Sequence, residues 1–161
     1  MAQNSKAGLL ARFLGVFAKG LGRLNLLPRL PSLQCDDHFA RIAAEPGVRV
    51  LVLTGSGRAF CAGFHLGELD ESDDSASEDP RLFEHTVDAL EALPLPTVAR
   101  LNGSVYGGAT DLALACDFRV GVSGMTLRMP AARLGLHYYP SGLQRYVSRL
   151  GLAAAKRLFL L

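Results

Sequence analysis

The sequence predicts an α/β fold in which short parallel strands alternate with helices. Two short apolar runs of strand length, Val48–Thr54 and Thr97–Leu101, are each followed by small residues. A helical pattern comes later in the chain after each of them, and this alternation is typical of a parallel sheet covered by crossover helices. Val48–Thr54 is apolar on both faces, which indicates a strand buried on both sides.

The N-terminal part differs from the rest of the chain in charge and in periodicity. Residues 1–35 contain five basic residues and no acid. Apolar residues recur there at helical spacing, namely Leu10, Phe13, Leu14, Phe17, Leu21 and Leu24. We therefore expect a basic amphipathic helix in an N-terminal extension, residues 1–35, ahead of a core that spans residues 36–161. Two interpretations stay open: a poorly ordered or surface-packed segment, or a helix for organelle targeting or contact with a membrane surface.

The elements of the core follow in order. Phe39–Ala44 is predicted to end a helix, because Glu45, Pro46 and Gly47 follow it. After the first strand, Glu68–Pro80 is rich in serine and acids and is predicted to be a mobile loop. Further helices are expected at Arg81–Leu93, Gly107–Cys116, Ser141–Leu150 and Leu152–Leu161, and further strands at Thr97–Leu101, Phe118–Val122 and Thr126–Met129.

Composition limits the class of protein. With 161 residues, 49% of them apolar, the chain can bury one substantial core. A net charge of +2 gives no reason to expect a nucleic-acid partner. The three cysteines, Cys35, Cys61 and Cys116, have apolar neighbours and suggest free thiols in a reducing compartment, so we expect a cytoplasmic protein, or alternatively a mitochondrial one. The chain has no uninterrupted apolar run long enough to cross a bilayer.

Two turns share one design. Gly55–Gly67 follows the first strand, and Asn102–Asp111 follows the second one. A strand that ends in small residues and then opens a helix leaves backbone N–H groups without partners. Two such turns can direct two donors at one oxygen, which is the arrangement of an oxyanion hole for a thioester carbonyl that becomes an enolate.

Four segments resemble the crotonase (enoyl-CoA hydratase/isomerase) superfamily. They are LVLTGSGRAFCAGFHLGEL at 51–69, NGSVYGGATDLALACDFRV at 102–120, Met129–Leu136 and Gly142–Gly151. The resemblance covers Val48 to Leu161 in register. It implies the ββα spiral core of the ClpP/crotonase type, an acyl-CoA thioester as substrate, and no cofactor apart from the coenzyme A of that substrate.

The family comparison also concerns the two ends of the chain. Family members are longer, with a C-terminal helical portion that covers the active site and builds trimers. We therefore expect a trimer-type homo-oligomer if the chain is not a fragment. Without that portion, Leu158, Phe159, Leu160 and Leu161 are expected to be uncovered. The strand pair that begins family members is not recognisable before Asp36.

The resemblance implies roles for residues of both turns. The N–H groups of Phe64 and Gly108, next to Ala62-Gly63 and Gly107, would hold the thioester oxygen. Asp111 lies on the first turn of the helix that begins near Gly108 and would move a proton at the carbons next to the thioester. The alternative is an acid that is favoured at a helix N-terminus by the helix dipole.

Four further residues are candidates for the site. Tyr138 and Tyr139 occupy positions where related isomerases and decarboxylases carry polar groups, and either hydroxyl can donate a hydrogen bond or a proton. Their alternative role is to pack in the core. His65 is expected at the mouth of the pocket, with the role of a base as its alternative. Arg58 is expected near the phosphates of coenzyme A, although a solvated arginine in a turn is equally compatible. Neither His65 nor His137 has partners at metal-ligand spacing, so no metal site is expected.

Ala131 is a departure from the family pattern that affects the expected reaction. Hydratases of the family place a second glutamate after the proline that corresponds to Pro130, and alanine cannot hold or activate water. We therefore expect an enzyme of the enoyl-CoA hydratase/isomerase type in which isomerisation or other enolate chemistry is favoured over hydration. The alternative is a non-catalytic acyl-CoA-binding or assembly module without a complete active site.

Overall fold

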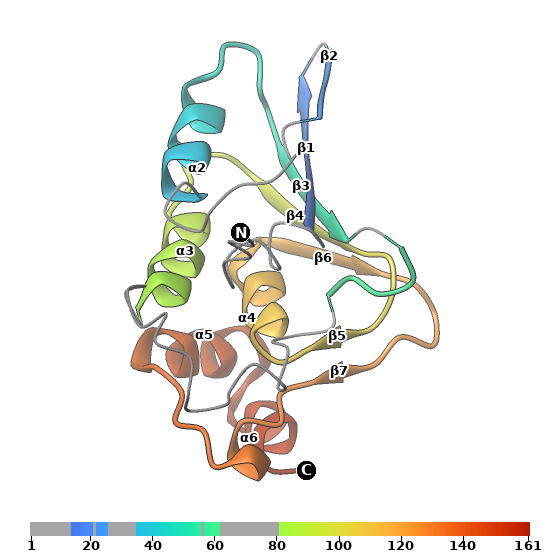
Figure 1. Ribbon diagram of the computed structural model, residues 1–161, viewed down its shortest axis with the longest axis vertical. Helices are drawn as coiled ribbons and strands as arrows, with labels where there is room; N and C mark the ends of the chain where they lie inside the picture. The colour runs from blue at the N-terminus through green and yellow to red at the C-terminus, as the bar shows by residue number, and fades with distance from the viewer. Residues whose placement is uncertain (1–13, 21, 26–34, 56, 62–80) are drawn as a thin grey trace, which may run out of the picture.

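A five-stranded sheet forms the centre of the protein (Figure 1). The computed structural model describes residues 14–20, 22–25, 35–55, 57–61 and 81–161. The sheet has the strand order β2-β1-β3-β4-β6. Its parallel part consists of β3 (Leu51–Gly55), β4 (Thr97–Leu101) and β6 (Phe118–Gly121). The alternating α/β arrangement with parallel strands is therefore confirmed.

The N-terminal strands correct one prediction. Leu14–Gly20 forms β1 and Gly22–Asn25 forms β2, and the two pair antiparallel as a hairpin. β1 also pairs antiparallel with β3, with Leu14 opposite Gly55 and Ala18 opposite Leu51. The helix expected from the spacing of Leu10 to Leu24 is thus wrong over the described residues, because pairing with β3 outweighs the local helical pattern. The sheet includes residues that the sequence pattern assigned to an extension.

The helices lie where the sequence predicts them. They are α2 (Cys35–Ala44), α3 (Leu82–Glu91), α4 (Gly108–Ala115), α5 (Pro140–Leu150) and α6 (Leu152–Leu160). Each helix packs on the next one in this series. In α4 all seven residues after Gly108 are buried, which fits a helix that is apolar on nearly all sides. This helix is therefore the centre of the helical layer.

Two short strands and one helical turn complete the fold. β5 (Val105–Tyr106) pairs in parallel with β7 (Leu127–Arg128) in a separate two-stranded sheet. β7 was predicted as part of Thr126–Met129, whereas β5 was not predicted and lies within the second turn. A 3₁₀ turn covers Ala132–Leu134.

The core consists of two apolar clusters that meet along α4. The larger cluster lies between the sheet and α2, α3 and α4, and it includes Leu51, Leu53, Val87, Leu90 and Leu112. The smaller cluster joins the far side of α4 to α5 and α6, and its buried members are Leu114, Met129, Ala131, Tyr146 and Ala155. The position of α4 is therefore fixed from both sides.

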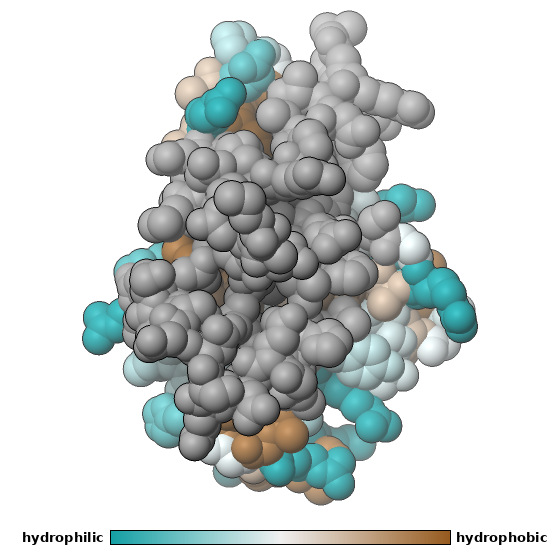
Figure 2. Space-filling view, viewed as in Figure 1, coloured by the Kyte–Doolittle hydropathy of each residue, from teal (hydrophilic) through white to brown (hydrophobic). Residues whose placement is uncertain are grey.

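The C-terminal helix is only partly uncovered. Leu158 and Phe159 are half-buried against the smaller cluster, with the Phe159 ring 4.8 Å from the Tyr146 ring between centroids. For these two residues the expected exposure is wrong, because both pack against the smaller cluster and the rings of Tyr138 and Tyr146 contact Phe159. Leu160 and Leu161 are exposed, at 60% and 80%. Figure 2 shows apolar surface beside polar surface at the lower end of the view, where α6 lies in Figure 1.

None of the helices in the described part of the chain is long and apolar enough to cross a membrane.

Candidate active site

The two predicted turns lie side by side. The Phe60 N–H donates to the Ser104 carbonyl at 3.1 Å, and the Tyr106 N–H donates to the Cys61 carbonyl at 3.1 Å. Cys61 also forms a parallel bridge with Val105. The first turn therefore runs beside the segment that leads into Gly108. The predicted site residues Ala62, Gly63, Phe64 and His65 lie outside the described residues.

One side chain that the sequence analysis did not assign holds the first turn in place. The Asn102 side-chain oxygen accepts the Gly55 N–H at 2.9 Å. Its amide nitrogen donates to the carbonyls of Gly57 at 2.9 Å and Ala59 at 3.3 Å. The backbones approach so closely that a Cβ on Gly103 would stand 2.1 Å from the Arg58 carbonyl oxygen. An asparagine directly between a strand and a glycine is the sequence signal that points to such a contact.

The second turn presents an unused N–H group at the start of α4. Gly107 has a φ of +59°, which favours glycine, and its N–H donates to the Arg128 carbonyl at 2.8 Å. The next N–H, that of Gly108, makes no hydrogen bond within the described ranges. A Cβ on Gly108 would stand 2.8 Å from the Phe83 ring. Glycine here therefore admits the ring and leaves a helix N-terminal donor available.

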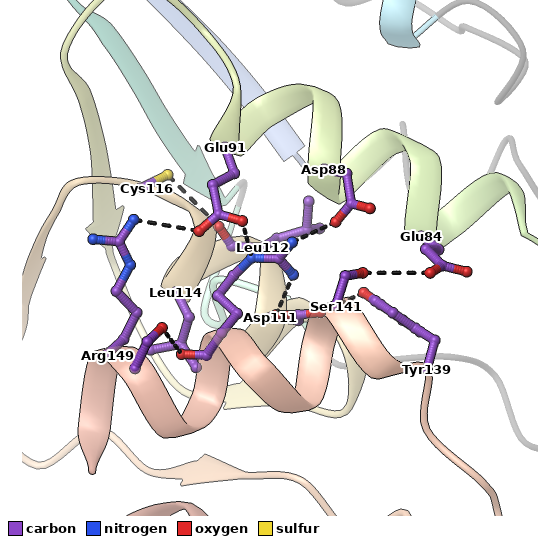
Figure 3. Close-up of polar contacts among 12 residues, drawn as sticks. Glu84, Asp88, Glu91, Asp111, Leu112, Leu114, Cys116, Tyr139, Ser141 and Arg149 are labelled. Atoms are coloured by element: carbon purple, nitrogen blue, oxygen red, sulfur yellow. Dashed lines mark hydrogen bonds and ion pairs between the residues drawn. The ribbon is translucent and has the colours of Figure 1, made fainter.

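Asp111 is completely buried and has three side-chain partners. Its Oδ1 accepts a hydrogen bond from Arg145 at 2.8 Å, and its Oδ2 accepts from the Tyr138 hydroxyl at 3.0 Å. Oδ2 also accepts from the Tyr139 hydroxyl (Figure 3). The sequence placed Asp111 and the tyrosines in one site, and the structure brings them together. The helix dipole alone therefore does not account for Asp111, because side chains that are distant in the sequence bind its carboxylate.

Tyr138 and Tyr139 are half-buried and stacked on each other, with ring centroids 4.5 Å apart. Burial first, and the charge of Asp111 second, raise the pKa of both phenols far above its ordinary value. Both therefore stay protonated near neutral pH and donate to the carboxylate. Tyr138 also packs edge-on against Phe159, so the two roles considered from the sequence, core packing and hydrogen-bond donation, are combined in this residue.

Gly142 makes room for this cluster. A Cβ at this position would stand 2.5 Å from the Tyr138 ring, 2.8 Å from the Tyr139 ring and 2.9 Å from Asp111 Oδ2. Any larger residue would therefore push the phenols and the carboxylate apart.

Arg145 is a site residue that the sequence analysis missed. It is 2% exposed. Besides Asp111, its guanidinium group contacts Glu91 at 2.9 Å and Asp88 at 2.5 Å, so that α3, α4 and α5 are joined (Figure 3). The signal was its spacing: Gly142, Arg145 and Tyr146 share the buried face of α5.

The remaining residues considered from the sequence form no hydrogen bond with Asp111 among the described residues. Arg58 is exposed in the first turn, and His137 is exposed just before the tyrosines. Ala131 is 5% exposed within the smaller apolar cluster. Within the described ranges, no three histidine, cysteine, aspartate or glutamate side chains gather as a metal site would require.

Comparison with known proteins identifies the family. The chain matches the enoyl-CoA hydratase/isomerase family over residues 25–161. It is 38% identical to an enoyl-CoA isomerase/hydratase of Mycosarcoma maydis over 116 residues, which cover 71% of this chain and 42% of that protein. It is 31% identical to the crotonyl-CoA hydratase of Syntrophomonas wolfei over 137 residues, which cover 84% of this chain and 53% of that protein.

Solved structures agree with this assignment. The enoyl-CoA hydratase from Bacillus anthracis superposes with a TM-score of 0.66 at 32% identity, covering 80% of this chain and 50% of that one. The chain thus spans about half the length of the curated relatives that it matches. The crotonase-type fold is confirmed, and the chain belongs to the enoyl-CoA hydratase/isomerase family.

Proposed function

We propose that the protein binds an acyl-CoA thioester and stabilises its enolate with the N–H groups of Phe64 and Gly108. The observation that carries this proposal is the Gly108 N–H at the start of α4, which makes no hydrogen bond to any described residue. The first turn runs beside it as far as Cys61, three residues before Phe64. Two preorganised donors lower the energy of a developing oxyanion more than that of the neutral carbonyl. In this proposal Arg58 pairs with the phosphates of coenzyme A.

Asp111 is the proton acceptor in this proposal, and Tyr139 passes the proton to it. The C–H bond next to the thioester breaks, its proton goes to the Tyr139 oxygen, and the Tyr139 hydroxyl proton moves to Asp111 Oδ2. Negative charge thereby leaves the carboxylate and appears on the enolate oxygen. The raised pKa of Tyr139 disfavours a free phenolate, so the two transfers occur together. Support comes from the complete burial of Asp111, which leaves the half-buried phenol as the more accessible group.

Isomerisation is the reaction that we favour over hydration. Return of the proton to a different carbon completes an isomerisation and needs only one acid–base group. Hydration also needs a water molecule that is held and deprotonated beside the β-carbon. Ala131, where hydratases of the family carry their second acid, is buried among Met129, Leu114 and Tyr146 and offers no group to hold such a water.

The test separates the effect of losing the Gly108 N–H from the effect of adding a side chain at this position. Phe83→Ala first makes room beside Gly108, since the Phe83 ring is what a Cβ would contact. Gly108→Ala and Gly108→Pro are then compared on this background. Both add a Cβ, but only proline lacks the N–H, and proline is accepted at the first position of a helix. We expect the proline variant to exchange the α-hydrogens of acyl-CoA with deuterated water about a hundred-fold more slowly than the alanine variant.

Mass spectrometry measures this exchange, and circular dichroism checks that both variants are folded. Equal exchange rates in the alanine and proline variants would contradict the role of the Gly108 N–H. Hydration of crotonyl-CoA at a rate that exceeds the exchange would contradict the preference for isomerisation. Binding of acyl-CoA by the unaltered protein without exchange or turnover would support the non-catalytic module instead.

A further inference from the structure

We propose that Arg145 is a positioning residue that holds Asp111 in the orientation needed for proton transfer, an inference that rests on the proposed role of Asp111. Arg145 does not contact the tyrosines through any hydrogen bond within the described ranges. It binds Oδ1 of Asp111, and the tyrosines bind Oδ2. The two oxygens of one carboxylate thus have separate tasks.

The geometry of the guanidinium group makes this arrangement rigid. Each of its three nitrogens contacts a different carboxylate: Nε contacts Glu91, and the two terminal nitrogens contact Asp88 and Asp111. A guanidinium group is planar, so its contacts to α3 fix the direction of the N–H that meets Asp111. Asp111 Oδ1 is therefore held in place, and Oδ2 remains directed at the phenols.

The charges require a cation at this place. Asp111 is fully buried, and a buried carboxylate without a partner is strongly unfavourable. Burial lowers the pKa of Arg145, but its hydrogen bonds and charge interaction with Asp111 raise it more, so the guanidinium group stays protonated. The groups around Asp111 are Arg145 and Tyr146 on α5, Tyr138 and Tyr139 before it, and Asp88 and Glu91 on α3.

Two variants of Arg145 and one matched control test the inference. Arg145→Gln removes the charge, whereas Arg145→Lys keeps it but cannot contact three carboxylates in one plane. The control is Arg149→Gln: Arg149 lies one turn further along α5, is exposed, and forms an ion pair with Glu91 at 3.4 Å but none with Asp111 among the described residues. We expect Arg145→Gln to lower kcat for hydrogen exchange about a hundred-fold with little change in KM, because misplacement of a catalytic group affects the chemical step. The kcat of Arg145→Lys should lie between those of Arg145→Gln and the unaltered protein. The kcat of Arg149→Gln should equal that of the unaltered protein.

A second measurement does not depend on activity. The chain has four tyrosines, so labelling with 3-fluorotyrosine gives four fluorine NMR signals, which Tyr→Phe variants assign. The Tyr139 signal reports on its hydrogen bond to Asp111. If Arg145 orients Asp111, both Arg145 variants should move the Tyr139 signal, although Arg145 makes no hydrogen bond to Tyr139 within the described residues. The charge of Arg145 also acts on Tyr139, so Arg145→Lys, which keeps that charge, is the variant that reports on orientation. Arg149→Gln should leave this signal in place.

The two measurements separate this inference from the proposed function. If the unaltered protein shows no exchange but the Tyr139 signal moves in the Arg145 variants, the proposed function is wrong and the positioning role stands. If exchange is present and both exchange and the Tyr139 signal are unchanged in the Arg145 variants, the positioning role is wrong. Movement of all four signals together with loss of acyl-CoA binding would show a general structural role and would also overturn it. Should Arg145→Gln not fold, Arg145→Lys decides by the same criteria.

Discussion

The two ends of α4 are built in different ways. At its N-terminal end the Gly108 N–H has no acceptor within the described ranges, and Asp111 is bound by residues from α5 and the loop before it. At its C-terminal end the carbonyls of Ala113, Leu114 and Cys116 all accept hydrogen bonds from Arg119. The carbonyls at one end accept hydrogen bonds from a side chain, whereas the Gly108 N–H at the other end has no acceptor among the described residues.

Groups that follow the C-terminal end also form hydrogen bonds within the protein. Asp117 accepts hydrogen bonds from the N–H and the hydroxyl of Thr97, and its own N–H donates back to that hydroxyl at 2.8 Å. Burial raises the pKa of the Cys116 thiol to about 12, so the thiol remains protonated. The contrast teaches that this end stabilises the scaffold, whereas the Gly108 N–H at the other end has no acceptor among the described residues and is the donor that the proposed function uses.

The largest expected effect comes from the carboxylate at the N-terminal end. Asp111→Asn cannot accept a proton, so we expect hydrogen exchange to fall by at least about a hundred-fold while binding of the CoA ester persists. Exchange followed by mass spectrometry and binding followed by calorimetry measure the two effects. Asp117→Asn is the control at the other end and should exchange at the normal rate. Full exchange by Asp111→Asn would remove Asp111 from the mechanism.

A smaller effect is expected from Gly142, which lies between the tyrosines and Asp111. In Gly142→Ala the added Cβ meets both phenol rings and Asp111 Oδ2. We expect a loss of about 1–3 kcal/mol in the free energy of unfolding, as for overpacked cores, and slower exchange. Denaturant titration and the exchange assay measure these, with Ser141→Ala as the neighbouring control. Unchanged stability and exchange in Gly142→Ala would mean that the cluster tolerates displacement.

The smallest effect concerns the acid dependence of stability at the C-terminal end. The backbone N–H of Thr97 lowers the pKa of Asp117 below its ordinary value. A lowered folded-state pKa gives stability that is present above the unfolded pKa of about 3.9 and is lost as the pH falls through the folded value. Asp117 is exposed, so we expect Asp117→Asn to cost about 1 kcal/mol or less at pH 7.

Denaturant unfolding at neutral pH and near pH 2 checks this prediction. The difference in the free energy of unfolding between the unaltered protein and Asp117→Asn should shrink toward acid pH. Protonation removes the charge of Asp117 in the unaltered protein, whereas the asparagine of the variant does not titrate. Hydrogen exchange from acyl-CoA should be the same in both at neutral pH. If the difference in the free energy of unfolding grew toward acid pH, it would contradict a lowered pKa of Asp117 in the folded protein.

The sequence predicts the central elements well because their signals are local. β4 and α4 have apolar patterns and glycines that determine their limits within a few residues. The helix expected before Asn25 is wrong because an apolar pattern there fits helical spacing, while the strand depends on pairing with β3, more than thirty residues away. Such long-range pairing leaves no local signal.

For the site, too, single residues can be predicted from local sequence, whereas the contacts between them cannot. Asp111 and Tyr139 are recognisable as candidates from their positions, but their contact, 28 residues apart, depends on how α5 packs on α4. Arg145 is one of seventeen basic residues, and sequence alone does not show which of these is buried. Only its place on the buried face of α5, beside Gly142 and Tyr146, distinguishes it. Asn102 was likewise missed because its partners lie in the other turn.

The Asn102 contacts have a consequence for the order of events during folding. Asn102 and Gly55 are 47 residues apart, so the first turn acquires its shape only after a long loop has closed. Closing such a loop costs chain entropy before its contacts repay it, which slows the step. The parallel pairing of β3 with β4 brings the same two segments together. The described part of the first turn and this part of the sheet should thus arise in one cooperative event, so the proposed site forms late in folding rather than in an early local structure.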